Sequence, residues 1–489
     1  MRMSARIGSV AAIAALVTVA PAAGQGVRVT GVSTARYAEL ATAVKDSIPM
    51  ENALGTGTLR LAPDGSVVRC TEGLPWCFYL GAGPRLSTVP LMQDLRASAW
   101  GFGQGVRAYA HVRGRAAVGQ ADALWPEADD PLDVLSAYVE VDRPSYRARL
   151  GRQWQTSSLG WYNFDGLALA YRPMDELTVE AYGGWSLMRG TNEYHDDALE
   201  GVEPFFPSER AYILGALARV RPAPGMAGSL LYQREIRTDR GALYSERLAA
   251  DARVSFGRGA VSGALQADLG AGWLNEARLR ADVPLAHGFS AAAEVRRYRP
   301  FFELWTIWGV FSPVGYGEGS GTLAWGRADE LGVRLTGAWR SYDEAHAGLA
   351  SAMLRTNGWR VGADAWWRPA EAWMASGAYW RHINFGAAQS EVDAALRRDW
   401  GETGYVGAHG ALFQSIREFS LGEGVVAGLG ANAAWRLNAD TRLSGSATAY
   451  RHLESPTPGT VDWTQVRATL QLEWAVGADP GMRGGGGGS

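Results

Sequence analysis

The chain has 489 residues, of which 47% are hydrophobic and 20% are charged, and its formal net charge is −3. This length suits two or three soluble domains or one large β-barrel, and the balanced charge gives no support for a nucleic-acid partner. Glycine (62) and tryptophan (20) are abundant. Small residues combined with aromatic ones are typical of barrel strands and of the aromatic girdles at their ends.

The N-terminus has the pattern of a secretory signal peptide. Arg2 and Arg6 precede an apolar run over residues 7–20, and small residues surround Gly24. We therefore predict a signal peptide over residues 1–24, cleaved near Gly24. No later apolar run reaches the roughly 18 residues of a spanning helix, so a place in the membrane would require a closed barrel.

Residues 25–88 are predicted to hold a first strand, over 27–40, followed by a long loop. The turn at 63–65 predicts a small hairpin within that loop. Cys70 and Cys77 follow, in what would be an oxidising compartment. A disulfide between them is favoured over a metal site, because no histidine lies in the same stretch.

Residues 89–476 repeat short segments in which apolar and polar side chains alternate. In the segment 424–438, for example, Val425, Ala427 and Leu429 share one face. Alternation over about ten residues is typical of a strand in a transmembrane β-barrel. The sequence therefore predicts an all-β fold, a transmembrane antiparallel β-barrel of roughly 18–22 strands. The Gly-rich residues 477–489 are predicted to form a flexible tail.

The connections between these segments are of two lengths. Short ones are predicted at 144–145, 174–175, 222–225, 329–330, 369–370 and 439–440, and longer ones at 119–131, 188–209, 301–316, 342–356, 384–402 and 454–463. Short periplasmic turns and long extracellular loops are typical of outer-membrane barrels.

Two tryptophans support a membrane barrel over a soluble β-sandwich, in which strands also alternate. Trp359 and Trp367 lie on the same apolar face, eight residues apart. At about 3.3 Å per residue and a tilt near 40°, this spacing covers roughly 20 Å of the membrane normal. The apolar band of a barrel is about 25 Å tall with aromatic girdles at both edges, so the spacing fits.

If the apolar faces meet lipid, the polar faces line the lumen. The predicted lumen residues, which are candidates for binding anions, are Arg107, His111, Arg113, Arg147, Arg149, Arg247, Arg278, Arg280, Arg360 and Arg436. Arginine rings bind anions and create selectivity in pores. A wide barrel also needs a charged, hydrated lumen in which arginines pair with acids, so both interpretations stay open.

Other segments give weaker signals. The loop 301–316 is unusually apolar, and we expect it to enter the lumen as a constriction, pack on the rim or form a strand. The acidic loop 193–203 is interpreted as solvated rather than as a cation site. The histidines are scattered and no nucleophile motif is present, so the sequence predicts neither an enzyme nor a metal or cofactor site.

One hairpin resembles a known family. Gly151–Arg152–Gln153, followed by Phe164–Asp165–Gly166–Leu167 and Tyr171, is similar to a hairpin of the alginate-export-type and phosphate-selective porins. The resemblance covers about two strands. It implies a monomeric or trimeric channel with a basic lumen for anionic solutes, in which Arg152 and Asp165 face the lumen. Alternation places Arg152 on the face of Leu150, so that orientation would require a β-bulge.

The sequence thus predicts a passive channel in the bacterial outer membrane for small hydrophilic solutes, with a bias towards anionic ones or acidic saccharides. Its expected surroundings are outer-membrane lipid and lipopolysaccharide, and no nucleic acid. The alternative is a structural barrel with an occluded lumen that presents its loops or docks a partner protein. The solute, the openness of the pore and the oligomeric state, including a homo-oligomer, are left open.

Overall fold

The computed structural model describes residues 26–63, 67–71, 73–119, 131–187, 211–238, 241–301, 315–327, 330–343, 356–383, 388–417, 424–454 and 464–477. The predicted signal peptide and almost all of the predicted tail lie outside these residues. The one helical element within them is the short 3-10 helix η1 (Met50–Asn52). No helix in the described ranges is long and apolar enough to cross a membrane.

The barrel strands follow one another along the chain. The first eleven are β1 (Gly26–Pro49), β4 (Trp76–Trp100), β5 (Val106–Gly119), β6 (Leu132–Asp142), β7 (Tyr146–Ser157), β8 (Gly160–Met174), β9 (Leu177–Ser186), β10 (Ala211–Val220), β11 (Met226–Arg237), β12 (Leu243–Phe256) and β13 (Gly259–Asp268). The remaining eleven are β14 (Trp273–Pro284), β15 (Phe289–Tyr298), β16 (Tyr316–Arg327), β17 (Leu331–Tyr342), β18 (Asn357–Ala370), β19 (Trp373–Ile383), β20 (Ala388–Asp399), β21 (Gly404–Arg417), β22 (Gly424–Asn438), β23 (Thr441–Glu454) and β24 (Thr464–Gly477).

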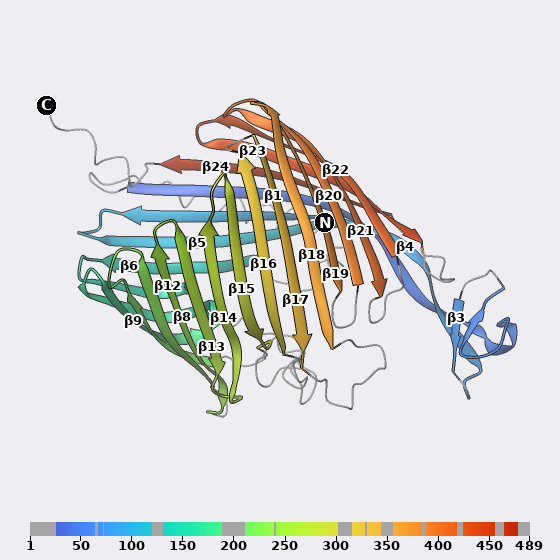
Figure 1. Ribbon diagram of the computed structural model, residues 1–489, viewed down its shortest axis with the longest axis horizontal. Coiled ribbons are helices and arrows are strands. Elements are labelled where there is room, and N and C mark those ends of the chain that lie inside the picture. The colour runs from blue at the N-terminus through green and yellow to red at the C-terminus, as the bar shows by residue number, and fades with distance from the viewer. Residues whose placement is uncertain are drawn as a thin grey trace, which may run out of the picture.

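These 22 strands close into one antiparallel barrel (Figure 1). Each pairs with its neighbours along the chain, and β1 pairs with β24 from Arg28 opposite Gly477 to Ala38 opposite Arg467. Closure gives the edge strands β1 and β24 hydrogen-bonding partners, which an open sheet would lack. The prediction of an antiparallel barrel of 18–22 strands is confirmed.

The two ends of the barrel differ in the length of their connections. Gly26 and Gly477, the first and last described residues, lie at the end of the barrel with the short turns, here called the turn end. Its connections are 101–105, 143–145, 175–176, 221–225, 257–258, 285–288, 328–330, 371–372, 400–403 and 439–440. The other end, here called the loop end, carries most of the longer connections, as predicted for the extracellular side.

One predicted loop was wrong. The segment 384–402, predicted as a single long connection, contains β20, which pairs with β19 and β21 along its length. Val392, Ala394 and Leu396 form its apolar face, but Ala395 on the opposite face interrupts the alternation of apolar and polar residues in the sequence.

The first connection is built on a two-stranded extension of the wall. Beyond a bulge at Ala41, β1 and β4 stay paired as far as Pro49 opposite Trp76, so part of the predicted first loop is strand. This hairpin projects from the barrel rim, with β3 (Val67–Cys70) at its tip (Figure 1). The short strand β2 (Leu59–Leu61) pairs with β3, and β3 pairs with β4.

The tip of this extension has a small core of its own. Val68, Cys70 and Cys77 are buried together with Ala62, and Ile48 packs against them. Cys70 and Cys77 lie opposite each other on β3 and β4 and form the predicted disulfide, which is confirmed. The disulfide ties the tip together without touching the barrel wall.

Replacing both cysteines with alanine should therefore loosen the tip and leave the barrel intact. Chain-entropy arguments give roughly 2–3 kcal/mol for a disulfide that closes so short a loop. Limited proteolysis should cut the variant within residues 50–75 faster than the wild-type chain, while the heat-modifiable mobility of the folded barrel on gels stays unchanged. Loss of that mobility would show that the disulfide supports the barrel itself.

Candidate functional site

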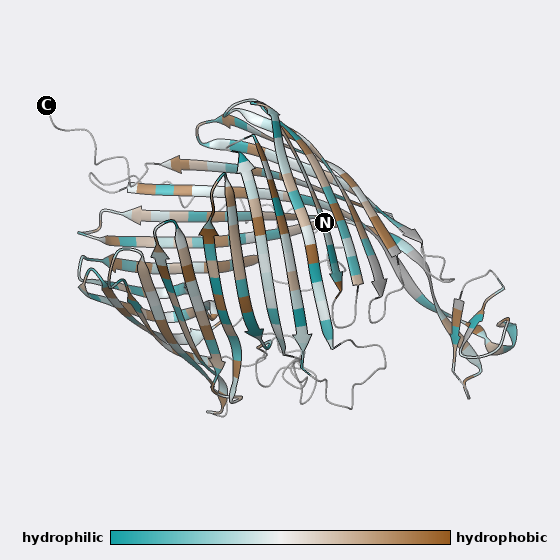
Figure 2. Cartoon of the chain, viewed as in Figure 1, coloured by the Kyte–Doolittle hydropathy of each residue, from teal (hydrophilic) through white to brown (hydrophobic). Residues whose placement is uncertain are grey.

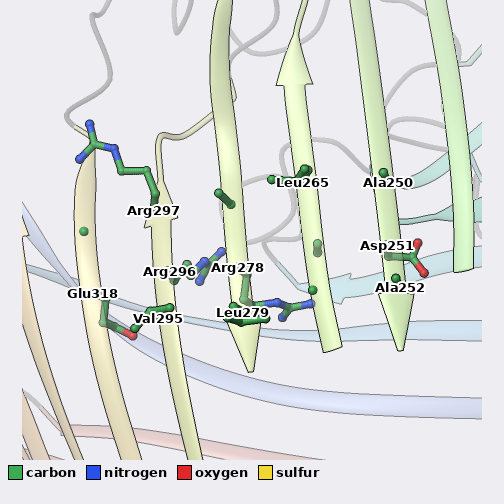
Figure 3. A pocket seen from close by; sticks show the side chains of 14 residues that line it. Ala250, Asp251, Ala252, Leu265, Arg278, Leu279, Val295, Arg296, Arg297 and Glu318 are labelled. Atoms are coloured by element: carbon green, nitrogen blue, oxygen red, sulfur yellow. The ribbon is translucent and has the colours of Figure 1, made fainter. Parts of the chain in front are cut away.

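The two faces of the wall differ in chemistry. Leu265, Leu279 and Val295 share one face of β13–β15 and are 52%, 54% and 58% exposed. They line a shallow groove of about 720 Å³, with Arg297 extending away from them at its edge (Figure 3). Apolar and polar residues alternate along the strands throughout the barrel (Figure 2). An exposed apolar face of this kind is suited to lipid, so the polar face is the inner one.

Aromatic side chains collect at both ends of the apolar face. At the turn end the rings of Trp400 and Trp435 lie 6.1 Å apart. At the loop end the rings of Trp185 and Tyr212 lie 5.6 Å apart. Trp367, one of the two tryptophans that support a membrane barrel in the sequence, is exposed near the turn end. Aromatic girdles at the two edges of an apolar band are typical of membrane barrels.

Most of the predicted lumen residues are engaged with acids on the wall. The pairs are His111 and Arg113 with Asp94, Arg147 with Glu180, Arg149 with Glu140, Arg278 with Glu276, Arg280 with Asp282 and Glu294, and Arg436 with Glu402. Arg360 lies over the ring of Trp380 at 5.9 Å. Arg107 is exposed and has no ion-pair partner among the described residues. Much of the positive charge is therefore balanced locally.

The tip of the β7–β8 hairpin leaves the wall. Pairing of β6 with β7 stops at Ala137 opposite Arg152, and pairing of β8 with β9 stops at Phe164 opposite Ser186. β7 and β8 nevertheless stay paired to Ser157. Residues 153–163 thus form a hairpin tip, here called the inward hairpin, that is paired with neighbouring barrel strands only at its base.

The inward hairpin lies across the inner face of β9–β13. Arg247 on β12 donates hydrogen bonds to the Leu159 carbonyl (3.3 Å) and to the Tyr162 hydroxyl (2.7 Å). Gln266 on β13 donates to the Ser158 carbonyl (2.8 Å). Three strands separate β8 from β12 along the wall, so these contacts require the hairpin to bend into the lumen.

Apolar packing holds the inward hairpin in this position. Leu159 and Phe164 are buried against a set of inner-face residues, namely Ala168, Tyr182, Ile213, Leu217, Leu231 and Ala249. The side chains of Leu, Ile and Phe each gain about 1.5–3 kcal/mol when fully buried. The hairpin is therefore a folded element that is fixed to the wall and narrows the lumen.

Glycines make the bend possible at the base of the hairpin. Gly151 on β7, Gly166 on β8 and Gly184 on β9 lie opposite one another across the sheet. Gly151 has a φ of +126°, and a Cβ there would lie 2.2 Å from the Ala137 carbonyl oxygen. A Cβ on Gly166 would lie 2.0 Å from the Gly183 carbonyl oxygen. No other residue type fits this close approach of backbones.

Arg152 and Asp165, the two residues taken from the family resemblance, lie where β7 separates from β6. They fill the gap between these strands, which is here called the seam. Arg152 Nε and Nη2 donate to the two carboxylate oxygens of Asp165 at 2.8 and 2.9 Å. Its Nη1 donates to the Val134 carbonyl on the free edge of β6 (3.0 Å), and Asn163 donates to the Leu135 carbonyl (3.1 Å). β7 keeps its register across Arg152, so no bulge intervenes. The Arg152 guanidinium is thus occupied by structural contacts.

The apolar loop 301–316 begins inside the lumen. The ring of Phe301 lies 3.9 Å from the Arg247 guanidinium, beside the inward hairpin. Residues 302–314 lie outside the described residues, as does the acidic loop 193–203. Among the described residues, no group of three or more His, Cys, Asp or Glu side chains is placed to hold a metal ion.

The sequence did not single out one row of aromatic residues. Tyr298, Tyr316 and Tyr342 lie opposite one another on β15–β17, with ring centroids 5.5 and 5.8 Å apart. The guanidiniums of Arg296 and Arg340 lie over Tyr298 and Tyr316 at 4.3 and 4.8 Å. The sequence signal for this row is that each of the three strands begins or ends with a tyrosine. The row requires knowledge of strand register, which the sequence does not give.

Comparison with protein-family models and with curated proteins finds no match. Solved structures that resemble the chain include Acinetobacter baumannii OccAB1 (10% identity, TM-score 0.35, 93% of this chain and 97% of that one). Pseudomonas aeruginosa OpdQ (7%, 0.40, 93% and 98%) and the outer membrane protein OprD from the same organism (8%, 0.35, 93% and 94%) also resemble it. At these scores we draw no functional argument from the likeness, and the assignment to alginate-export-type or phosphate-selective porins stays a prediction.

The bend at the base of the inward hairpin is testable with a buried reporter. In a Leu159→Cys variant the new thiol should react slowly with a maleimide, because Leu159 at the tip of the hairpin is buried against the wall. Adding Gly151→Ala introduces backbone strain of about 1–3 kcal/mol, which should raise the labelling rate about tenfold or more.

Gly337→Ala is the matched control, because an added Cβ there meets no atom within 4 Å. It should leave the labelling rate unchanged. Equal rates in the Gly151 and Gly337 variants would contradict the role assigned to Gly151.

Proposed function

We propose that the chain is a channel in the bacterial outer membrane, through which small hydrophilic solutes pass passively. A closed barrel with an exposed apolar face and a polar inner face supports a place in a membrane. The signal peptide predicted over residues 1–24 directs the chain out of the cytoplasm, and the barrel then inserts into the outer membrane.

The inward hairpin is the observation that carries the proposal. It is attached to the wall by apolar packing on one side of the lumen, over β9–β13. A scaffold with an occluded lumen would have its lumen filled, whereas the inward hairpin packs against one stretch of the wall, β9–β13. A channel with one narrowed part fits this arrangement, because the width and charge of its narrowest part decide what passes.

A modest preference for anions follows from the charges on the inner wall. The acids Asp94, Glu140 and Glu180 each contact arginine, whereas the exposed Arg107 has no carboxylate within ion-pairing distance among the described residues. Glu391 and Asp393 on β20 carry negative charge on the same face, which keeps the preference small. The hairpin resemblance makes acidic saccharides one candidate class of solute.

The projecting β1–β4 hairpin favours the alternative of a barrel that docks a partner. Its tip is folded and disulfide-bonded, and Leu54, Leu74 and Trp76 are exposed on it. Exposed apolar side chains at the end of a projecting hairpin suit a protein–protein contact. The two functions are compatible, since the tip lies away from the lumen.

Trimming the inward hairpin should enlarge the pore. Replacing residues 154–163 with a short Gly-Ser turn removes Leu159 from the lumen and should raise single-channel conductance severalfold in planar bilayers. Heat-modifiable mobility on gels verifies that the variant still folds. An unchanged conductance from a folded variant would mean that the hairpin is not the constriction.

Removing an unpaired wall charge should weaken the anion preference. For Arg107→Gln we expect a lower chloride-to-potassium permeability ratio, measured as the reversal potential under a salt gradient, because no carboxylate is freed by the change. The control is Arg258→Gln at the exposed β12–β13 turn, where the change likewise frees no carboxylate among the described residues. A ratio that responds equally to both variants would assign the preference to the rim instead of the lumen.

A further inference from the structure

The lipid-facing side of the wall carries arginines at one height near the loop end. Four of them lie on every fourth strand, and they are Arg234 on β11, Arg297 on β15, Arg381 on β19 and Arg451 on β23. Their partners across the sheet belong to the apolar face, namely Leu214, Ala277, Val361 and Ala427. These four residues, here called the arginine belt, therefore point outwards, where a membrane barrel carries few charges.

The strands set the height of the arginine belt. Each of its arginines follows by eight residues an outward-facing residue at the turn end of the same strand, and these residues are Met226, Phe289, Trp373 and Leu443. At about 3.3 Å per residue and a tilt near 40°, eight residues cover roughly 20 Å of the membrane normal. The apolar band is about 25 Å tall, so the belt lies near its loop-end edge, where an arginine side chain reaches the lipid headgroups.

The members of the arginine belt differ in their partners. Arg234 and Arg297 pair with nearby carboxylates, and Arg381 donates a hydrogen bond to a serine hydroxyl. Arg451 is exposed and has no ion-pair partner among the residues that the structure describes. Its guanidinium is therefore available to a ligand.

A second arginine lies close to Arg451, where β24 meets β1. Thr464 on β24 lies directly opposite Arg451, and its hydroxyl accepts a hydrogen bond from Arg85 Nη2 of β4 at 3.2 Å. The Arg85 side chain is 65% exposed and pairs with Glu39 at 3.1 Å. Two guanidiniums and one carboxylate leave a net positive charge at this point of the outer face.

An apolar surface extends from these two arginines towards the turn end. Ala431, Ala447 and Ala468 lie opposite one another on β22–β24. Leu429 and Leu470, one on each side of this alanine row, are 72% and 55% exposed. Short side chains between projecting ones let hydrocarbon chains lie close against the wall.

We propose that this surface binds a phosphate-bearing lipid of the outer leaflet, lipopolysaccharide, with a phosphate between Arg451 and Arg85 and acyl chains along the alanine row. A phosphate monoester carries about −1.5 to −2 charges at pH 7 and has three acceptor oxygens, so it can engage both guanidiniums. The loop end is the predicted extracellular side, and several acyl chains match a surface three strands wide. The inference rests on the proposed place in the outer membrane and not on conduction.

Native mass spectrometry of the full-length folded chain, purified in detergent without lipid, tests the site. The chain is mixed with lipid A, the phosphorylated lipid part of lipopolysaccharide, or with dephosphorylated lipid A, which has the same acyl chains. Phosphatidylglycerol supplies a phosphodiester lipid, and inorganic phosphate supplies the anion alone. We expect lipid A to bind about tenfold more tightly than each of the other three, because it alone combines phosphate monoesters with several chains.

Variants locate the binding. Arg85→Gln combined with Arg451→Gln should weaken lipid A binding about tenfold or more, and Arg85→Lys with Arg451→Lys should keep part of it, since the charges remain. Arg398→Gln is the matched control, because Arg398 also faces outwards but lies at the turn end, opposite Trp373. It should leave lipid A binding unchanged. Heat-modifiable mobility on gels verifies that each variant folds.

Two results would overturn the proposal. One is lipid A binding no more tightly than dephosphorylated lipid A or phosphatidylglycerol, and the other is wild-type binding by the variant that combines Arg85→Gln and Arg451→Gln. Phosphate-dependent lipid binding by a chain that conducts no ions would instead refute the channel and support the site. A conducting channel without phosphate-dependent lipid binding would refute the site alone.

Discussion

The structure depends on one constraint, which is that every strand edge of the wall must be paired. The β1–β24 pairing meets this requirement for the barrel as a whole. Where the inward hairpin departs from β6, the requirement is met by side chains. Arg152 and Asn163 donate to the Val134 and Leu135 carbonyls of the free β6 edge. Side-chain hydrogen bonds thus replace the backbone hydrogen bonds that are lost where β7 leaves β6.

The inward hairpin organises the lumen into two unlike sides. Its apolar side, with Leu159, is fixed on the wall of β9–β13, and its other side carries Trp154 and encloses a small cavity against β4–β7. The Gly-Arg-Gln and Asp-Gly sequences supply both the glycines of the bend and the charged pair beside it. Gly151 and Gly166 permit the bend, and Arg152 with Asp165 seals the seam. These sequences therefore have a structural role in this chain, whatever solute it passes.

The sequence predicted the wall but not its interior. Period-two alternation is local, so it correctly indicated an antiparallel barrel of 18–22 strands, and the Cys70–Cys77 spacing indicated the disulfide. The contact between Leu159 and Ile213 depends on which strands lie side by side, which no local pattern encodes. One signal was present. Residues 211–217 are apolar on both faces, which is typical of a strand covered on both sides and indicated that something lies on the inner wall. The row of Tyr298, Tyr316 and Tyr342 shows the limit most clearly, because it becomes visible only once the neighbouring strands are in register.

Single-channel conductance of the purified wild-type barrel in a planar bilayer, with the reversal potential under a salt gradient, tests the central claim most directly. The account predicts steady conductance steps with a modest preference for chloride over potassium, because the polar face lines the lumen and, among the described residues, Arg107 has no ion-pair partner. A correctly folded, heat-modifiable barrel that conducts no ions would contradict it. The inward hairpin would then be part of a plug, and the projecting β1–β4 hairpin would become the functional surface.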